Sequence, residues 1–167
     1  AASAGLKTRI VEEVHCGERK VSSTQIRNLL AAGEVQEAAG ILGYRYSLLG
    51  VVVAGNKLGR TMGFPTANMQ LYEPLKMVPA DGVYAVEVET LGQRYGGICN
   101  IGTRPTVGAG NARTIETNIL GFDDNIYGLD IRVSFIARLR DEHRFASLDE
   151  LRHQLEADRR QASVYFV

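Results

Sequence analysis

The segment Gly63-Phe64-Pro65-Thr66-Ala67-Asn68 places a hydroxyl and a carboxamide two residues apart, just after a proline. Pro65 has a fixed φ and favours an extended Phe64, which predicts a turn that leads into a strand. Thr66 and Asn68 then point to the same face of that strand. Neutral oxygen ligands of this kind can coordinate Mg²⁺ whose charge is partly neutralised by phosphates. The alternative is a turn followed by polar residues that cap backbone groups at a strand edge.

The loop before this motif has three glycines spaced four residues apart, namely Gly55, Gly59 and Gly63. Glycine lets backbone N–H groups turn toward an anion without interference from a Cβ atom. Lys57 and Arg60 add positive charge to the same loop, which therefore suits a polyphosphate. The spacing is neither that of a Walker A loop nor that of a dinucleotide-binding loop. Taken alone, such a loop is more often a plain connection between strands.

Glu116 is a candidate base for proton transfer. It lies in the segment 114–120, whose alternating pattern predicts a strand with Thr114, Glu116 and Asn118 on its polar face. A carboxylate there could accept the proton of a substrate hydroxyl or orient that hydroxyl. The other interpretation is a solvated outer face, where charged side chains usually lie.

The elements that must position these residues are mostly strands. Several short strands, Gly-rich turns and one terminal helix predict a mainly β fold. We expect a small antiparallel, Greek-key-like barrel, closed or nearly closed, with a C-terminal α-helix. The predicted strands are Tyr44–Ala54, Gly82–Thr90, Gln93–Ile101, Thr114–Leu120 and Leu129–Leu139.

Helices are expected at both ends of the chain. Ser147 and Glu150 form a capping box at the start of the last helix, whose apolar stripe would be Leu148, Leu151 and Leu155. Near the N-terminus, a strand is predicted over Thr8–Val14. A helix capped by Ser22-Ser23-Thr24 follows and stops at Gly33, and a second helix spans Val35–Leu42.

Composition narrows the class of protein. The 167 residues include 19 Lys+Arg and 19 Asp+Glu, so the net charge of zero argues against nucleic acid and anionic membranes as partners. The longest apolar stretch, Leu48–Ala54, is too short to span a bilayer, and no signal peptide is visible. Cys16 and Cys99 are far apart, which disfavours a disulfide framework or a zinc site and indicates a reducing, cytoplasmic location.

Gly-x₃-Gly-x₃-Gly-Phe-Pro-Thr-Ala-Asn resembles the signature of riboflavin kinases, both the stand-alone enzymes and the C-terminal module of bacterial bifunctional FAD synthetases. The resemblance covers residues 44 to about 166. It implies transfer of the γ-phosphate of ATP to the 5′-hydroxyl of riboflavin, with Mg²⁺, to give FMN and ADP. Further segments resemble the family in its order: Pro79–Ala85, Asn100–Thr106, Thr114–Asn118, Gly121–Gly128 and Phe145–Leu151.

The resemblance also implies roles for individual residues. Glu116 would be the general base, and Thr66 and Asn68 would bind Mg²⁺ and phosphates. Asn118 and Arg104 stand where many relatives carry His and Asn, which leaves the surroundings of the site in doubt. The implied nucleotide-binding residues are Gly55, Lys57, Gly59, Arg60, Gly63, Thr66 and Asn68, and the implied flavin-binding residues are Asn68, Glu116, Phe122, Arg140 and Phe145.

The segment Lys20–Arg27 resembles the Ser-Ser-Thr-x-Ile-Arg motif near the end of the FMN adenylyltransferase module. Hydroxyls and an arginine at a helix N-terminus can hold phosphates. Taken alone, a well-capped helix explains them better, but the position of the segment, directly before a kinase-like module, favours the phosphate site. The resemblance implies that residues 1–43 are the end of a Rossmann-like adenylyltransferase domain and that 44–167 form the kinase barrel. Its partner would be the adenylyltransferase domain of the full-length protein, so this chain alone should not make FAD.

Two other functions fit the same pattern. One is a non-catalytic flavin- or nucleotide-binding barrel, and the other is a nucleotide-binding barrel that acts on a different small alcohol. The presence of Thr66, Asn68 and Glu116 together favours the kinase, because a binding protein would not need all three.

Overall fold

The computed structural model describes residues 12–17, 19–55, 63–106 and 110–166, together with residues 5, 7 and 9. In this part of the chain no helix is both long and apolar enough to cross a membrane. The elements, in chain order, are β1 (His15–Cys16), β2 (Arg19–Lys20), α1 (Ser23–Ala32), α2 (Val35–Leu42), β3 (Ser47–Val53), β4 (Ala67–Leu71), β5 (Gly82–Thr90), β6 (Gln93–Thr106), β7 (Gly110–Ile119), β8 (Asp130–Arg140) and α4 (Leu148–Ser163).

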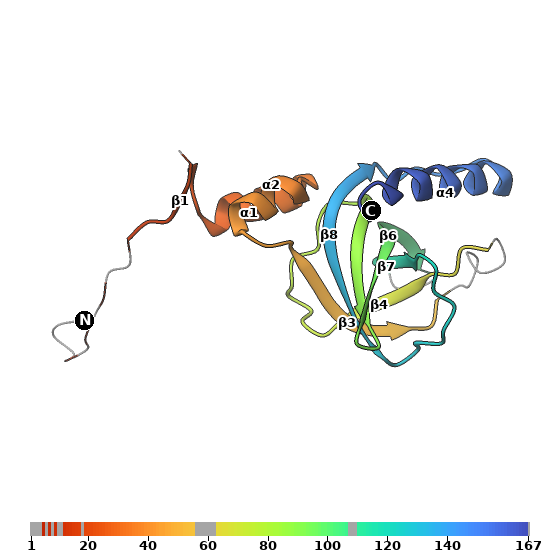
Figure 1. Ribbon diagram of the computed structural model, residues 1–167, viewed down its shortest axis with the longest axis horizontal. Helices are drawn as coiled ribbons and strands as arrows, with labels where there is room; N and C mark the ends of the chain where they lie inside the picture. The colour runs from red at the N-terminus through yellow and green to blue at the C-terminus, as the bar shows by residue number, and fades with distance from the viewer. Residues whose placement is uncertain are drawn as a thin grey trace.

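Six antiparallel strands close into a barrel in the order β3-β4-β7-β6-β5-β8 (Figure 1). The strands β5, β6 and β7 follow one another as hairpins, and β8 returns to lie beside β5. This is the strand order of a Greek key. The structure therefore confirms the barrel predicted from the alternating segments.

The barrel interior is filled by the apolar side chains of alternate strand positions. Tyr84 and Phe135 are fully buried and meet edge to face, with ring centroids 5.2 Å apart. The Tyr84 hydroxyl donates to the Ala80 carbonyl at 2.6 Å, so this buried polar group is satisfied. Burial raises the pKa of Tyr84 to about 12, which keeps the phenol neutral.

Helices α1 and α2 pack onto this same core. Leu30, Val35 and Ala38 are at most 1% exposed and belong to one buried cluster with the barrel residues. The Ala80 amide donates to the Leu30 carbonyl at 2.9 Å, which joins α1 to the segment before β5. Gly33 ends α1 with a φ of 81°, as predicted for a glycine cap.

Helix α4 lies across the outer surface of the barrel (Figure 1). Its predicted cap is confirmed, since the Glu150 amide donates to Ser147 Oγ at 3.2 Å. The predicted apolar stripe is found only in part, because Leu148 is 61% exposed, Leu151 and Leu155 are half-buried, and the fully buried residues of the helix are Asp158 and Ala162. The helix is attached through its C-terminal half, where an ion pair replaces part of the expected apolar contact.

The expected strand over Thr8–Val14 is not found in the residues described there. Residues 12–14 are not in a strand, and the structure has instead the short β1–β2 pair, with His15 opposite Lys20. The remaining predicted strands are confirmed, with β6 and β7 longer than predicted. Their added residues continue the hairpin beyond Ile101 and before Thr114.

Candidate active site

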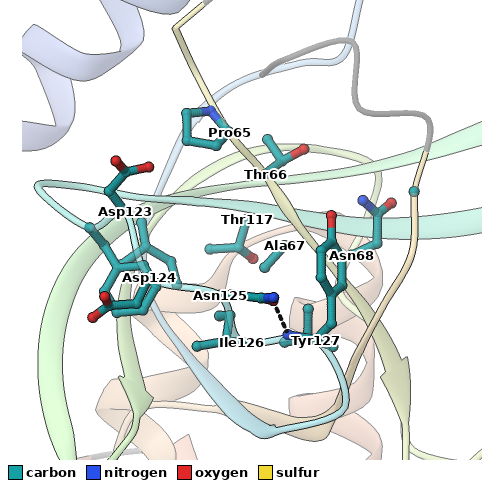
Figure 2. A pocket seen from close by; sticks show the side chains of 14 residues that line it. Pro65, Thr66, Ala67, Asn68, Thr117, Asp123, Asp124, Asn125, Ile126 and Tyr127 are labelled. Carbon is teal, nitrogen blue, oxygen red and sulfur yellow. Dashed lines mark hydrogen bonds between the residues drawn. The ribbon is translucent and has the colours of Figure 1, made fainter. Parts of the chain in front are cut away.

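A pocket opens beside the start of β4, between this strand, β7 and the loop that follows β7 (Figure 2). Thr117 and Ala67, which are paired across the β4–β7 ladder, form part of its wall. The lining residues are Val52, Gly55, Pro65, Thr66, Ala67, Asn68, Thr117, Ile119, Phe122, Asp123, Asp124, Asn125, Ile126 and Tyr127.

Thr66 and Asn68, the two residues of the motif with oxygen-bearing side chains, both line this pocket (Figure 2). Asn68 lies in β4, and Thr66 immediately precedes this strand. The extended backbone that Pro65 favours therefore continues into β4. The Asn68 carboxamide lies against Gly55, where an added Cβ would stand 2.1 Å from Asn68 Nδ2. A glycine is therefore required at position 55 for this amide to take its place.

A side chain of β7 fixes the motif from the other side. Asn118 Nδ2 donates to the Pro65 carbonyl at 2.7 Å. Asn118 thus holds the backbone just before Thr66, a role that the resemblance to the family did not imply. Since a side-chain amide is a good donor to a carbonyl, the Asn found here has a clear structural role.

Glu116 lies next to the motif on the neighbouring strand. In the β4–β7 ladder it is directly opposite Asn68, and in the β6–β7 ladder it is directly opposite Asn100. Directly paired residues project to the same face, so the three side chains share one side of the barrel wall. Glu116 is only 9% exposed, which rules out the solvated outer face considered from the sequence. It is within 3.4 Å of Thr114 Oγ1 and is not part of the pocket lining.

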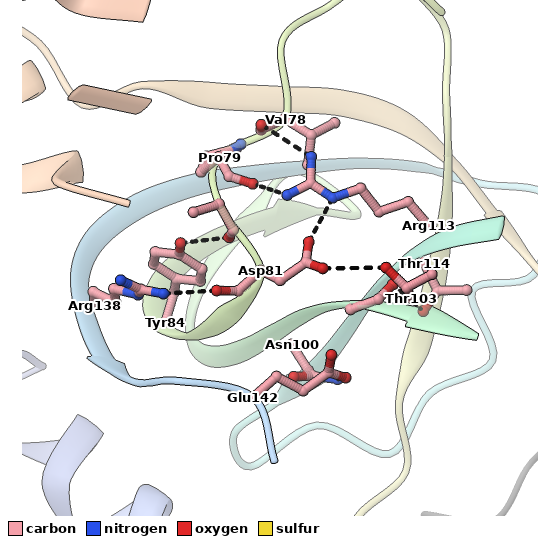
Figure 3. Close-up of polar contacts among 12 residues, drawn as sticks. Val78, Pro79, Asp81, Tyr84, Asn100, Thr103, Arg113, Thr114, Arg138 and Glu142 are labelled. Carbon is pink, nitrogen blue, oxygen red and sulfur yellow. Dashed lines mark hydrogen bonds and ion pairs between the residues drawn. The ribbon is translucent and has the colours of Figure 1, made fainter. Parts of the chain in front are cut away.

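A second carboxylate approaches this face from the segment after β8. Glu142 accepts a hydrogen bond from Asn100 Nδ2 at 3.3 Å (Figure 3). It packs over Gly102, where an added Cβ would lie 1.9 Å from Glu142 Oε1. The segment between β8 and α4 therefore covers the polar face that carries Glu116, which explains why Glu116 is buried.

The loop after β7, which the family resemblance offered as a candidate wall of the flavin site, lines the pocket. Phe122, the one residue of this loop that was named individually, has its ring edge to face against Tyr95 at 5.0 Å. Asn125 Oδ1 accepts from the Tyr127 amide at 3.2 Å (Figure 2). The signal in the sequence was a loop bounded by Gly121 and Gly128. The lining residues that were not named individually are Asp123, Asp124, Asn125, Ile126 and Tyr127.

Two of the expected flavin-binding residues lie at another place. Arg140 makes a bidentate ion pair with Asp158 of α4, at 2.9 and 2.8 Å, and Asp158 is 1% exposed. Phe145 packs against this guanidinium, 5.8 Å from its ring centroid. Neither side chain lines the pocket, and both instead hold the segment that covers Glu116.

The remaining expected contacts belong to the loop before Pro65. Gly63 has a φ of 81°, in the left-handed region that favours glycine. Lys57, Gly59 and Arg60 lie outside the described residues. Among the described residues, no group of three or more His, Cys, Asp or Glu could hold a metal ion. A cation at the motif would thus depend on neutral oxygen ligands and on its substrate.

Residues 42–166 match the family described as Flavokinase, riboflavin kinase. The chain belongs to the riboflavin kinase family. It is 40% identical over 159 residues to the bifunctional riboflavin kinase/FMN adenylyltransferase of Bacillus subtilis, covering 94% of this chain and 50% of that protein. With the bifunctional protein of Escherichia coli K12 the identity is 44% over 151 residues, covering 90% and 47%.

The chain spans about half the length of these curated relatives. Among solved structures, one described as a macrolide-efflux protein from Streptococcus pneumoniae is 40% identical with a TM-score of 0.85, covering 92% of this riboflavin kinase chain and 50% of that chain. Riboflavin kinase from Trypanosoma brucei is 22% identical with a TM-score of 0.51, covering 71% and 75%. At that identity the second likeness shows a shared fold.

Proposed function

We propose that this chain transfers the γ-phosphate of ATP to the 5′-hydroxyl of riboflavin. One observation carries the proposal: Asn68 of the pocket motif lies directly opposite Glu116 on the next strand. A group that can hold phosphates and a carboxylate that can take a proton therefore stand on neighbouring positions. Membership of the riboflavin kinase family supplies the substrates.

The nucleotide would occupy the pocket beside β4. Asn68 and Gly55, the last described residue before Lys57 and Arg60 in the chain, both line this pocket. Asp123 and Asp124 lie on the loop at the other side, where their charge disfavours a polyphosphate. The phosphates would thus lie toward Gly55 and Asn68, with Lys57, Gly59 and Arg60 as further expected contacts.

Thr66 and Asn68 would hold Mg²⁺ together with the phosphates. Both line one pocket and both carry oxygen ligands, which suits a hard cation. When bound, this ion would neutralise the charge that develops on the transferred phosphoryl group. Neutral ligands are sufficient because the phosphates bring the negative charge.

Glu116 would act on the acceptor. Its carboxylate takes the proton of the riboflavin 5′-hydroxyl while that oxygen bonds to the γ-phosphorus. The bond between the γ-phosphorus and the bridging oxygen breaks, and ADP leaves. Burial beneath the Glu142 segment excludes water from this proton transfer.

The flavin ring would lie near Phe122 and the segment that covers Glu116. Phe122 offers an aromatic surface at the pocket. Arg140 and Phe145 would contribute by holding the 141–147 segment against the barrel, since Arg140 is already bound to Asp158. We further propose that the full-length protein has an adenylyltransferase domain, of which residues 1–43 are the end.

A direct assay tests the reaction. The chain is incubated with riboflavin, ATP and Mg²⁺, and the flavins are separated by chromatography. The expected product is FMN in an amount equal to the ADP released, with no FAD. Binding of riboflavin and ATP without FMN would instead support a non-catalytic barrel, and FMN that forms only with another donor would overturn the role of ATP.

A further inference from the structure

The carboxylate of Asp81 joins both strands of the β6–β7 hairpin (Figure 3). Its Oδ1 accepts from Arg113 Nε at 2.6 Å, and its Oδ2 accepts from Thr103 Oγ1 at 3.1 Å. Thr103 and Arg113 are directly opposite each other in the ladder. The Asp81 carboxylate, placed just before β5, therefore binds the two strands of the hairpin at one directly opposed residue pair.

The Arg113 guanidinium makes further contacts with the segment before β5. Its Nη1 donates to the Val78 carbonyl at 3.2 Å, and its Nη2 donates to the Pro79 carbonyl. The neighbours of β7 in the barrel are β4 and β6, so Arg113 ties β7 to a segment that the sheet does not pair with it. The planar fork of arginine suits several acceptors held in a fixed arrangement.

The Asp81 backbone is itself held in place. Arg138 Nη2 donates to the Asp81 carbonyl at 2.7 Å, and the Tyr84 hydroxyl holds the preceding carbonyl of Ala80. Next to it, Gly82 leaves no room for a side chain, since an added Cβ would lie 2.9 Å from the Arg140 carbonyl. The carboxylate thus projects from a rigid segment, and its position is defined by the barrel core.

The residue pair that Asp81 binds, Thr103 and Arg113, lies close to Glu116 along the hairpin. Thr114 follows Arg113 directly, and its Oγ1 is 3.3 Å from the Gly102 carbonyl and 3.4 Å from Glu116 Oε1. A continuous set of contacts therefore runs from Asp81 through Arg113 and Thr114 to Glu116. On the other side of β7, Asn68 opposes Glu116.

We propose that Asp81 is a positioning residue, which sets the place of Glu116 through Arg113 and its partner Thr103 in the β6–β7 hairpin. This inference rests on the proposed function. The side chains of Arg113 and Asp81 are 39% and 41% exposed, so their ion pair contributes little to folding stability. The contacts of Arg113 with the Asp81 carboxylate and with the carbonyls of Val78 and Pro79 serve geometry, and small displacements of a catalytic group lower turnover strongly.

The test is a double-mutant cycle between Asp81→Ala and Glu116→Gln, measured in the FMN-forming assay. Asp81→Ala alone should lower kcat by about 10- to 100-fold, with KM for ATP changed less than about twofold because Asp81 is not in the pocket lining. In the Glu116→Gln background the same change should have almost no further effect, since the residue that it positions no longer acts. Asp81→Asn, which keeps part of the hydrogen bonding, should recover part of the lost kcat.

Glu87→Ala is the matched control. Glu87 lies in β5, the strand that follows Asp81. It pairs with Arg45 at 3.3 Å and with Arg94 at 3.8 Å, and it has no ion pair with Arg113. It should leave kcat unchanged, and all variants should melt within a few degrees of the wild type. Should Asp81→Ala not fold, the cycle is carried out with Asp81→Asn.

The outcomes separate this inference from the proposed function. A wild-type chain that forms no FMN would overturn both. An active wild type in which the effects of Asp81→Ala and Glu116→Gln multiply would overturn only the positioning role, because Asp81 would then act independently of Glu116. An unchanged kcat in Asp81→Ala would do the same.

Discussion

Asn68 and Glu116 face each other across the β4–β7 ladder, and this pairing joins the phosphate-binding motif to the carboxylate of a distant segment. Neither residue is informative alone, since a strand-edge amide and a strand carboxylate are both common. Their register makes them one site. The same pairing means that a slip of β7 by one residue would turn Glu116 to the barrel interior.

Glu116→Gln tests the proposed base. Glutamine keeps the size and hydrogen-bonding capacity of the side chain but cannot take a proton, so kcat should fall by roughly 10²- to 10⁴-fold. Riboflavin and ATP should bind with nearly unchanged affinity, as measured by flavin fluorescence and calorimetry. A variant that retains more than about half of the wild-type kcat would remove Glu116 from its role as the base.

Gly55→Ala tests the close approach of Asn68. The new methyl group would stand 2.1 Å from Asn68 Nδ2, so the amide has to leave its place. We expect KM for ATP to rise by about tenfold or more, since one polar contact to the phosphates is lost. The measurement is the ATP dependence of FMN formation at saturating riboflavin.

Gly40→Ala is the control for that variant. Gly40 lies in α2 with nothing within 4 Å of an added Cβ, so its replacement should stabilise the fold by about 0.5–1 kcal/mol and leave KM unchanged. Similar KM values in Gly55→Ala and wild type would show that Asn68 does not need this position.

The sequence predicted the barrel because each of its long strands buries one face. The alternation of apolar and polar residues along such a strand indicates the buried face directly. It could not predict how α4 is attached, since the attachment includes the ion pair of Asp158 with Arg140 and the buried Ala162. The pattern of Leu148, Leu151 and Leu155 indicated the helix correctly, but Leu148 is exposed and the other two are only half-buried. Long-range polar contacts leave no periodic signal in a sequence.

The candidate site was predictable to a similar extent. Thr66 and Asn68 could be placed on one face because the proline and the strand are local features. The burial of Glu116 could not be foreseen. The segment that covers its face carries Glu142, which contacts Asn100 although the two residues are far apart in the sequence. Of the pocket residues in the loop after β7, only Phe122 was named individually, since a loop carries no periodicity that would select the others.

The Arg140–Asp158 pair should contribute strongly to stability. Asp158 is 1% exposed and also accepts from Gln154 Nε2 at 2.8 Å. Asp158→Ala leaves a largely buried guanidinium without its partner, which should cost about 3–5 kcal/mol in the free energy of unfolding. Urea unfolding measures this. The control is Glu156→Gln, which breaks the exposed pair with Arg152 and should change stability by less than about 0.5 kcal/mol.

Cys99 should make folding stability depend on pH in alkaline solution. Burial raises the pKa of the Cys99 thiol from 9.0 to about 12. As pH rises, the unfolded chain loses this proton first, so the contribution of Cys99 to stability is constant below about pH 9 and falls between pH 9 and pH 12. The decrease due to Cys99 should approach 1.4 kcal/mol per pH unit at most, since about one proton is involved.

Unfolding in urea at several pH values measures this decrease. Cys99→Ala should show a shallower decrease between pH 9 and pH 10, whatever its stability at neutral pH. Equal slopes in the two proteins would contradict the assignment to Cys99. Tyr84, whose pKa burial also raises to about 12, adds its own decrease above pH 10 in both proteins.

Helices α1 and α2 should be needed for the barrel to fold. Leu30, Val35 and Ala38 share the buried core of the barrel, and the Leu30 carbonyl accepts from Ala80. A chain that starts at Tyr44 would expose this apolar surface, so it should unfold at lower temperature or bind a hydrophobic dye. A chain that starts at Val21 keeps both helices and should melt like the full chain.

Leu30→Ala gives the same test without truncation. It removes a side chain that is 1% exposed, so it should lower the free energy of unfolding by about 2–5 kcal/mol. Leu75→Ala is its control, because Leu75 is 93% exposed and its loss should change stability by less than about 0.5 kcal/mol. If the chain from Tyr44 and Leu30→Ala both melted like the full chain, the helices would be an appendage. The domain limit at residue 43 would then also be the limit of the folding unit.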